Sequence, residues 1–399
     1  MSLTYDAFRA LLDGERLPAL VVDLDAFDRN VTRHVSLLRG HALTLRSATK
    51  SIRIRTLLRR LLDRGGSTFR GLMCYSADEA ASLADAGFDD LLLAYPTLQP
   101  GPLRRLAKCV AKGCLIRVAV DSSEGATALA RAGASEGVAM KACICVDMSI
   151  TFGTYFLGVR RSPLHTPEQV LSLAREARTQ GLEVDAILAY EAIVAGLPDD
   201  VRGSLTNGIK AAIKRRAMPE LIDRRAKIVN LLTRDGFALG IANGGGTGSL
   251  EQTVHDGSLT EVTAGSGFFK PHLFDAYRSA FVRSLEPACF FALEVTRTPT
   301  AEFVTCHGGG YVASGSFDPP KGPLPSLPQG LSLLPHEMAG EVQTPLRLPR
   351  GLALPLGSPV MFRHAKAGEV TEHFRRAILV QGGRIVDRVA TYRGEDDPS

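Results

Sequence analysis

Residues 70–96, "RGLMCYSADEAASLADAGFDDLLLAYP", contain two short apolar runs separated by a helical stretch. The first run covers 70–76, the alanine-rich stretch follows it, and the second run covers 90–96. An apolar strand, a helix that covers it and another apolar strand are typical of a parallel sheet with buried faces. This segment therefore predicts one unit of an α/β fold.

The same alternation extends from residue 19 to about residue 270 and contains nine apolar runs. Eight strand–helix units in about 250 residues fit a (β/α)8 barrel better than an open sheet. One run must then lie outside the barrel, and the first is our candidate. The runs are "ALVVDL" (19–24), "ALTLRSA" (42–48), "RGLMCYS" (70–76), "DLLLAYP" (90–96), "CLIRVAV" (114–120), "KACICVDM" (141–148), "VDAILAY" (184–190), "FALGIANGGG" (237–246) and "LTEVTAGSG" (259–267).

The pattern changes beyond about residue 285, where short strand-like runs alternate with turns and proline-rich sequence. Such a change predicts a second, mostly β domain. We assign residues 1–280 to the barrel domain and residues 281–399 to the smaller domain. About the first 25 residues are candidates for packing on the second domain.

Composition narrows the classes of protein that fit. The chain has 399 residues, 45% of them hydrophobic and 22% charged, with a net charge of +5. The basic residues are spread and form no stripe with interleaved aromatics, which argues against nucleic-acid binding. No run of about 18 apolar residues is present, so we expect no membrane span. Seven scattered cysteines indicate reduced thiols, and hence a cytoplasmic protein.

Two glycine-rich turns follow the last two runs of the predicted barrel. They are "NGGGTGS" (243–249) and "TAGSGFF" (263–269). Glycine lets backbone N–H groups approach an anion, and barrels commonly hold a phosphate after strands 7 and 8. Either turn alone could simply be the place where a strand ends, but the two turns together predict a phosphate site. The candidate residues are Asn243, Gly245, Gly246, Thr247, Gly265, Ser266 and Gly267.

Lys50 lies where the run 42–48 ends, in "LRSATKSIR" (45–53). A lysine at a strand end is usually a solvated surface charge. Beside a phosphate site at the same barrel face, its amine instead suggests a Schiff base. Pyridoxal 5′-phosphate (PLP) carries both a phosphate and an aldehyde, and it then acts as an electron sink. We therefore interpret Lys50 as the cofactor-binding and catalytic lysine.

This combination resembles the fold-type III PLP enzymes, the alanine racemase-like barrels. The closer resemblance, over essentially the whole chain, is to their D-threonine aldolase and D-serine dehydratase branch, in a group loosely called amino acid deaminase/aldolase. "LRSATKSIR" is similar to the branch's lysine motif and includes Arg46, and "LAYEAIVAG" (188–196) is similar to the strand with its cofactor-side tyrosine, here Tyr190. The resemblance implies a homodimer whose sites form at the subunit interface.

Two positions depart from the branch. The histidine usual two residues after the lysine is Ile52 here, and the usual metal pair is His364 with Lys366 in "RHAKAGE" (363–369). Because a protonated lysine is a poor metal ligand, we expect no divalent metal at this pair. We take His364 and Lys366 as candidates for acid–base work or for anchoring the substrate. For Lys366 a surface turn remains the alternative.

Other candidate residues keep two interpretations. Either Arg160 or Arg161 contacts the cofactor, or the two arginines form a surface pair. Cys306 and His307 could join His364 in a rearranged metal site, although their spacing matches no known zinc motif. Cys143 and Cys145 are expected in the core. Tyr311 is expected to be a packed aromatic, with action across a subunit interface as the alternative.

The resemblance implies a PLP-dependent lyase that acts at Cα of a small, D-configured β-hydroxy amino acid. The expected reactions are aldol cleavage and dehydration with deamination. An amino acid racemase and a non-catalytic PLP-binding protein are the alternatives, as is a barrel enzyme for a sugar phosphate, which would need the phosphate turns but not Lys50.

Overall fold

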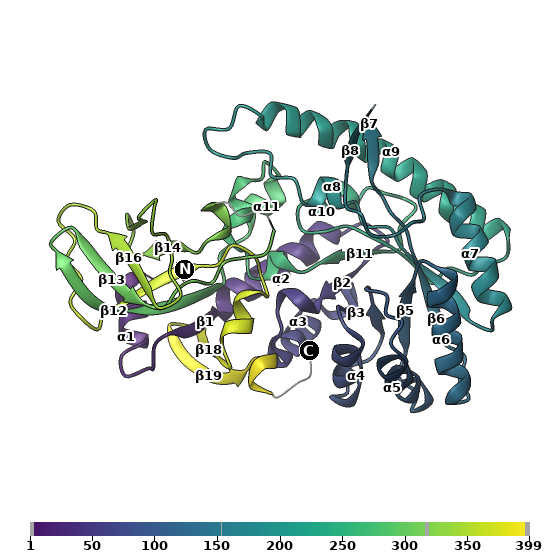
Figure 1. Cartoon of the computed structure of the whole chain (residues 1–399), viewed down its shortest axis with the longest axis horizontal. Helices are drawn as coiled ribbons and strands as arrows, with labels where there is room; N and C mark the ends of the chain where they lie inside the picture. The colour runs from purple at the N-terminus through teal and green to yellow at the C-terminus, as the bar shows by residue number, and fades with distance from the viewer. Residues whose placement is uncertain (1–3, 153, 316–318, 396–399) are drawn as a thin grey trace.

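A closed barrel of parallel strands forms the larger part of the molecule (Figure 1). The computed structural model describes residues 4–152, 154–315 and 319–395. The barrel strands are β2 (Thr44–Ala48), β3 (Phe69–Cys74), β4 (Leu91–Leu93), β5 (Ile116–Val120), β6 (Lys141–Cys145), β9 (Glu183–Leu188), β10 (Ile241–Gly244) and β11 (Glu261–Ala264). Around the barrel their order is β10-β11-β2-β3-β4-β5-β6-β9, so the predicted barrel is confirmed.

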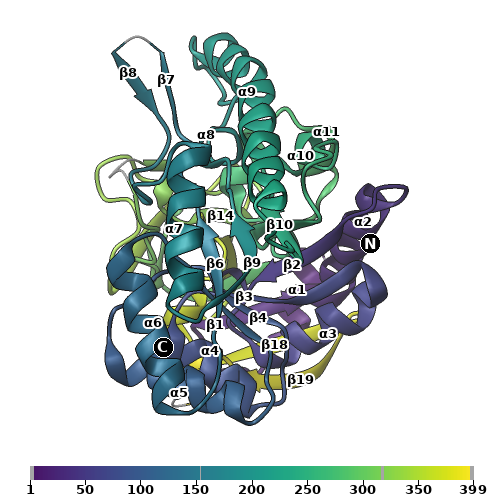
Figure 2. The ribbon, with the colours of Figure 1, turned by 90° about the vertical axis from the view of Figure 1, so that its right-hand side faces the viewer.

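Helices cover the outside of the barrel (Figure 2). Hydroxyl side chains begin several of them as expected from N-capping: Ser76 and Ser122 each accept a backbone N–H, and Thr166 forms a full capping box. The helices are α2 (Leu24–Leu38), α3 (Arg55–Gly65), α4 (Ala77–Asp85), α5 (Pro100–Ala111), α6 (Ser123–Ser135), α7 (Pro167–Thr179), α8 (Ala192–Ala195), α9 (Asn207–Arg234), α10 (Leu250–Thr253) and α11 (Ala280–Ser284). Their apolar faces and the outward-facing strand residues form the main core.

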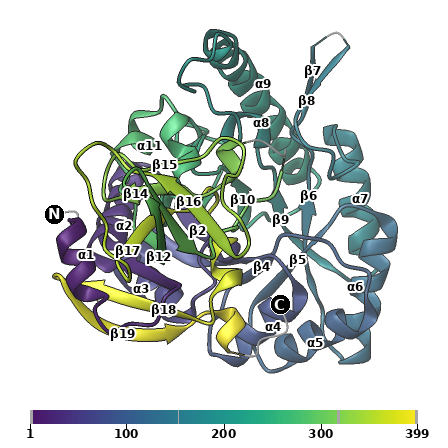
Figure 3. The ribbon, with the colours of Figure 1, turned by 60° about the vertical axis from the view of Figure 1, so that its left-hand side comes forward.

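A second sheet lies beside the barrel and comes forward in Figure 3. Its strands within the described residues are β1 (Ala19–Asp23), β12 (Cys289–Thr300), β13 (Phe303–His307), β14 (Leu324–Leu327), β15 (Ser332–Leu333), β16 (Gln343–Arg347), β17 (Pro359–Arg363), β18 (Arg376–Gln381) and β19 (Arg384–Ala390). The run "ALVVDL" is therefore outside the barrel. β1 lies between β12, to which it is antiparallel, and β18, to which it is parallel.

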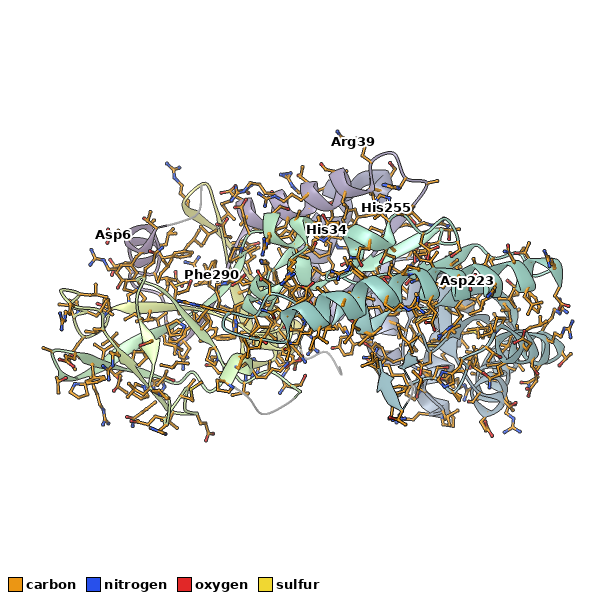
Figure 4. All side chains as sticks on the ribbon, turned by 90° about the horizontal axis from the view of Figure 1, so that it is seen from above. Asp6, His34, Arg39, Asp223, His255 and Phe290 are labelled. Atoms are coloured by element: carbon orange, nitrogen blue, oxygen red, sulfur yellow. The ribbon has the colours of Figure 1, made fainter. Side chains whose placement is uncertain are left out.

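Helix α1 (Tyr5–Leu11) packs on this second sheet. Phe8 meets Phe290 edge to face, with ring centroids 5.5 Å apart. Figure 4 shows Asp6 of α1 at this end of the molecule and Asp223 of α9 toward the opposite, barrel end. The N-terminal segment thus contacts the sheet built by the C-terminal part of the chain.

The hairpin of β7 (Ile150–Phe152) and β8 (Tyr155–Leu157) projects from the barrel (Figure 2), and Arg224 of α9 donates to the Ser149 carbonyl at its base at 2.9 Å. Within the described residues, no helix combines the length and the apolar character needed to span a bilayer. All seven cysteines lie in the described part of the chain, and each is free.

Candidate active site

A cavity of about 500 Å³ opens at the carboxyl ends of the barrel strands. Each strand end contributes to its wall, as in barrels generally. The residues that lie at or just after the ends of β2, β3, β4, β5, β6 and β9 and line the cavity include, in that order, Lys50, Tyr75, Tyr95, Asp121, Cys145 and Tyr190. The turns that follow β10 and β11 complete the wall, so Lys50 and both glycine-rich turns share one cavity, as the sequence predicted.

Lys50 lies in a 3₁₀ turn, Thr49–Ser51, directly after β2. Its Nζ donates a hydrogen bond to Tyr95 Oη at 2.8 Å. Thr49 Oγ1 donates to the carbonyl of Met73 on β3, and Arg53 Nε donates back to the Lys50 carbonyl at 3.1 Å. Several bonds therefore fix the backbone that carries the amine.

The second domain packs against the outside of this turn. Gly368 approaches so closely that an added Cβ would lie 1.7 Å from the Lys50 carbonyl oxygen. The Arg53 guanidinium forms an ion pair with Glu372, and the Tyr392 N–H donates to the Arg53 carbonyl at 3.0 Å. The turn is thus held between barrel and sheet.

A buried carboxylate, Glu79, lies under the same contact. Its two oxygens accept hydrogen bonds from the Tyr392 hydroxyl at 3.0 Å and from the Tyr75 N–H at 2.8 Å. Burial opposes ionisation more strongly than these bonds favour it, so the pKa of Glu79 is raised to about 7. The carboxyl group therefore titrates near neutral pH at the contact between the domains.

The two glycine-rich turns leave four backbone N–H groups free to bind an anion. In the described part of the chain, the amides of Thr247, Gly248, Gly265 and Ser266 have no hydrogen-bond acceptor. All four residues line the cavity. Glycine turns with unpaired amides fit a phosphate group, so the geometry fits the phosphate of PLP within reach of a lysine.

Three of the predicted turn residues donate their backbone N–H groups to acceptors inside the protein, and their contact with a phosphate stays a prediction. Gly245 donates to Glu191 Oε2 at 3.0 Å and Gly246 donates to Ser249 Oγ at 3.2 Å. Gly267 donates to Thr247 Oγ1 at 3.1 Å. These bonds shape the turns.

Arg46 uses its guanidinium inside the protein, and a direct contact with the cofactor stays a prediction. Its side chain is fully buried, and its Nε pairs with Glu261 at 2.7 Å while a terminal nitrogen pairs with Asp90 at 3.1 Å. Asn243 donates to the same Glu261 at 2.8 Å and to Thr263 at 2.9 Å, and both Asn243 and Thr263 line the cavity. Arg46 therefore lies below the residues that form the cavity floor.

Tyr190 lies where the sequence placed it. A Cβ added at Gly246 would meet the Tyr190 ring at 2.8 Å, so the ring packs against the glycine turn. Burial raises the pKa of the Tyr190 phenol to about 12. Arg161 also lines the cavity, whereas the Arg160 guanidinium lies over the Phe156 ring, 4.2 Å from its centroid.

Sequence reasoning missed Tyr95 and Asp121. Both lie just after barrel strands, and a polar residue in that position was the available signal. Burial raises the pKa of Asp121. Cys143 is buried in the core as expected, and Cys145 packs against the same core cluster and also lines the cavity.

His364 and Lys366 lie outside the cavity wall, and their roles in acid–base work or in anchoring the substrate stay a prediction. Neither is among the described residues that line the cavity. His364 is 3% exposed, its ring packs edge to face on Phe269, and burial together with Arg363 lowers its pKa to about 3. A catalytic role for His364 stays an untested prediction.

The Lys366 ammonium forms its hydrogen bonds within the second domain. It donates to the Ser314 carbonyl at 2.7 Å and to its hydroxyl at 3.2 Å. Burial lowers its pKa despite Glu369, and the neighbouring Lys321 and Lys50 ammonium groups lower it further. Lys366 therefore lies close enough to Lys50 for their charges to interact.

The other candidates differ in burial. Cys306 is fully buried and His307 is exposed. Among the described residues, no three His, Cys, Asp or Glu side chains gather as a metal site. Tyr311 stacks on His373, with ring centroids 4.5 Å apart, as expected for a packed aromatic.

Comparison with solved structures identifies the fold. D-threonine aldolase from Filomicrobium marinum superposes with a TM-score of 0.79 and 21% identity over 95% of both chains. The chain has the fold of the D-threonine aldolase branch of alanine racemase-like barrels. This confirms the fold that the resemblance implied.

Two curated relatives are similar to this chain in sequence. A 3-hydroxy-D-aspartate aldolase of Paracoccus denitrificans (strain Pd 1222) is 26% identical over 256 residues, which are 63% of this chain and 60% of the relative. A D-threo-3-hydroxyaspartate dehydratase of Delftia sp. (strain HT23) is 28% identical over 174 residues, 43% of each chain. The similarity thus spans about 60% or less of these relatives. No model of a known protein family matches the sequence.

Proposed function

We propose that this chain is a PLP-dependent lyase that acts at Cα of a small, D-configured β-hydroxy amino acid. The supporting observation is one cavity that holds the Lys50 amine and four unpaired backbone amides on two adjacent turns. The similar proteins named as an aldolase and a dehydratase of hydroxyaspartate support the same reaction class.

The chain's own residues have distinct parts in this proposal. The amides of Thr247, Gly248, Gly265 and Ser266 bind the phosphate, and Lys50 supplies the amine that carries the cofactor. Bound PLP supplies a sink for the electron pair released when a bond to Cα breaks. Tyr95 accepts a hydrogen bond from Lys50 Nζ and so orients the amine toward the cavity.

Two outcomes fit such a cavity. Cleavage of the Cα–Cβ bond transfers the β-hydroxyl proton to a base and yields an aldehyde, and Cα then takes up a proton to give glycine. Loss of the α-proton and the β-hydroxyl instead releases water, and hydrolysis of the resulting imine by water gives ammonia and a keto acid. Asp121 is our candidate base, because it lines the cavity and burial raises its pKa toward the working range.

We also propose that the enzyme works without the branch's usual metal pair. Lys366 replaces one ligand of that pair, and its ammonium is occupied by Ser314. A cation at this place disfavours a second cation through charge repulsion. Activity that survives chelator and gains nothing from added Mn²⁺ is the expected result; activity that needs the metal contradicts this part.

Absorbance spectroscopy tests the cofactor and the lysine. Purified protein mixed with PLP is expected to give a visible band that borohydride abolishes while fixing the cofactor to the protein. Lys50→Ala is expected to lack the fixed cofactor, whereas the matched variant Lys366→Ala retains it. A wild-type protein that fixes no PLP, or loss confined to Lys366→Ala, would refute the assignment.

Product analysis then decides the reaction. D- and L-forms of β-hydroxy amino acids are incubated with the loaded protein. Aldehyde plus glycine indicates aldol cleavage, and keto acid plus ammonia indicates dehydration. Interconversion of the D- and L-forms without cleavage would replace the proposal by a racemase.

A homodimer in the cytoplasm completes the proposal. The side chains of Leu205 and Ile209, just before and at the start of α9, are 99% and 63% exposed, and a partner would cover them. Seven free thiols suit a reducing compartment. Light scattering on wild type and on Leu205→Asp is expected to show a dimer that the variant weakens.

A further inference from the structure

Three charged side chains are buried together behind the first glycine turn. Glu191 follows β9, Arg225 lies on α9 and Asp256 follows α10. The Arg225 guanidinium contacts Glu191 Oε2 at 3.2 Å and Asp256 Oδ2 at 3.0 Å, and none of the three side chains is exposed. Burial of such a set seldom increases stability over apolar packing, so its placement suggests a structural or functional purpose.

Glu191 binds the glycine turn directly. Its Oε2 accepts the Gly245 N–H at 3.0 Å, and its Oε1 accepts the Ser249 hydroxyl at 2.8 Å and the Thr253 hydroxyl. Burial opposes ionisation of Glu191, but Arg225 and these donors outweigh it and lower the pKa below its usual value. The carboxylate is therefore ionised where it meets the turn.

These bonds determine which amides face the cavity. Gly245 adopts φ +88°, a left-handed conformation that suits glycine, and its amide points back toward Glu191. The amides of Thr247 and Gly248 are left unpaired at the cavity wall. Thr247 Oγ1 also accepts the Gly267 N–H at 3.1 Å, so the second turn is tied to the first.

We propose that Glu191, held by Arg225, is the positioning residue for the anion-binding turns. The inference rests on the proposed function, because it assigns the phosphate of the cofactor to those turns. Glu191 also adjoins Tyr190 in sequence, and the Tyr190 ring packs against Gly246 of the same turn. The charge of Glu191 acts at a distance from the ligand, through the backbone of residues 243–249.

The test compares two ligands that differ only in the phosphate. Apparent Kd values for PLP and for pyridoxal are measured by absorbance on wild type and on Glu191→Gln. The variant keeps the side-chain shape but loses the charge. We expect PLP affinity to fall by about tenfold or more, the size of one hydrogen bond to a charged group, with little change for pyridoxal.

A matched control removes another buried, arginine-paired carboxylate. Asp28 pairs with Arg60 at 2.6 Å and with Arg64 at 2.7 Å on the outside of the barrel. Asp28→Asn is expected to leave the PLP-to-pyridoxal affinity ratio unchanged even where stability falls. A generally structural role for Glu191 would weaken both ligands equally in Glu191→Gln and would overturn the inference.

A second variant covers the case in which Glu191→Gln does not fold. Thr253→Val removes one hydroxyl donor to Glu191, keeps the side-chain shape and leaves the three charges in place, and it is expected to lower the same ratio to a smaller extent. An unchanged ratio in the folded variant refutes the positioning role. Failure of wild type to fix PLP refutes the proposed function instead, so the two failures are distinguishable.

Discussion

Replacing Gly368 by alanine tests whether the second domain holds the catalytic turn. Gly368 has φ +83°, and an added Cβ would lie 1.7 Å from the Lys50 carbonyl oxygen and 2.9 Å from the Ser51 Cα. Both contacts involve backbone, so no flexible side chain can move aside. The Lys50 turn or the segment 364–369 must shift.

The expected cost has two parts. The left-handed conformation costs a non-glycine residue about 1–2 kcal/mol. Inserting a methyl group into a filled space costs about 1–3 kcal/mol more. Gly357 is a matched control in the same domain, because it has the same φ of +83° and open space around its Cβ position. Gly357→Ala is therefore expected to show only the first part.

Two assays separate these effects. Chemical denaturation followed by circular dichroism is expected to place Gly368→Ala about 1–3 kcal/mol below Gly357→Ala in unfolding free energy. Borohydride trapping is expected to show reduced fixation of PLP on Lys50 in Gly368→Ala alone. Equal destabilisation of both variants with normal trapping would show that the domain contact does not position Lys50.

Three more perturbations follow from the site. Folding raises the pKa of Glu79 from 4.5 to about 7, so the protonated carboxyl stabilises the fold fully below pH 4.5 and this contribution, about 3 kcal/mol, is lost as pH rises through 7. Glu79→Gln should therefore make the unfolding free energy depend less on pH across this range, and an unchanged slope contradicts the assignment. Tyr95→Phe removes the acceptor for Lys50 Nζ and should lower kcat by about tenfold while PLP titration stays normal, since a hydrogen bond to a charged group contributes about 1.5–3 kcal/mol; full activity would exclude the bond from catalysis. Arg46→Met leaves Glu261 buried without its cation and should lower the unfolding free energy, measured with denaturant, by about 3–5 kcal/mol. The double variant Arg46→Met/Glu261→Met should regain stability, and wild-type stability of the single variant would count against the buried pair.

The sequence predicted the features that depend on local pattern. Alternating apolar runs and helices predicted the barrel, and Lys50 and the glycine turns could be placed because strand ends of a barrel meet at one face. Partners distant in the chain could not be found in this way. Arg46 was predicted as a site residue because the motif around Lys50 resembles that of the branch, but its ion-pair partner Glu261, 215 residues away, could not be predicted from the motif. The contact of Gly245 with Glu191 likewise joins segments 54 residues apart.

The position of β1 between β12 and β18 affects how the protein is made. Its apolar residues leave the ribosome before the barrel, but both neighbouring strands are synthesised after it. The barrel can therefore form while β1 still lacks its neighbouring strands, and an unpaired apolar strand can pair with a non-native strand or with another chain. A fragment that starts at residue 281 would lack an interior strand of its sheet. The second domain therefore cannot be cut out as one continuous piece of chain.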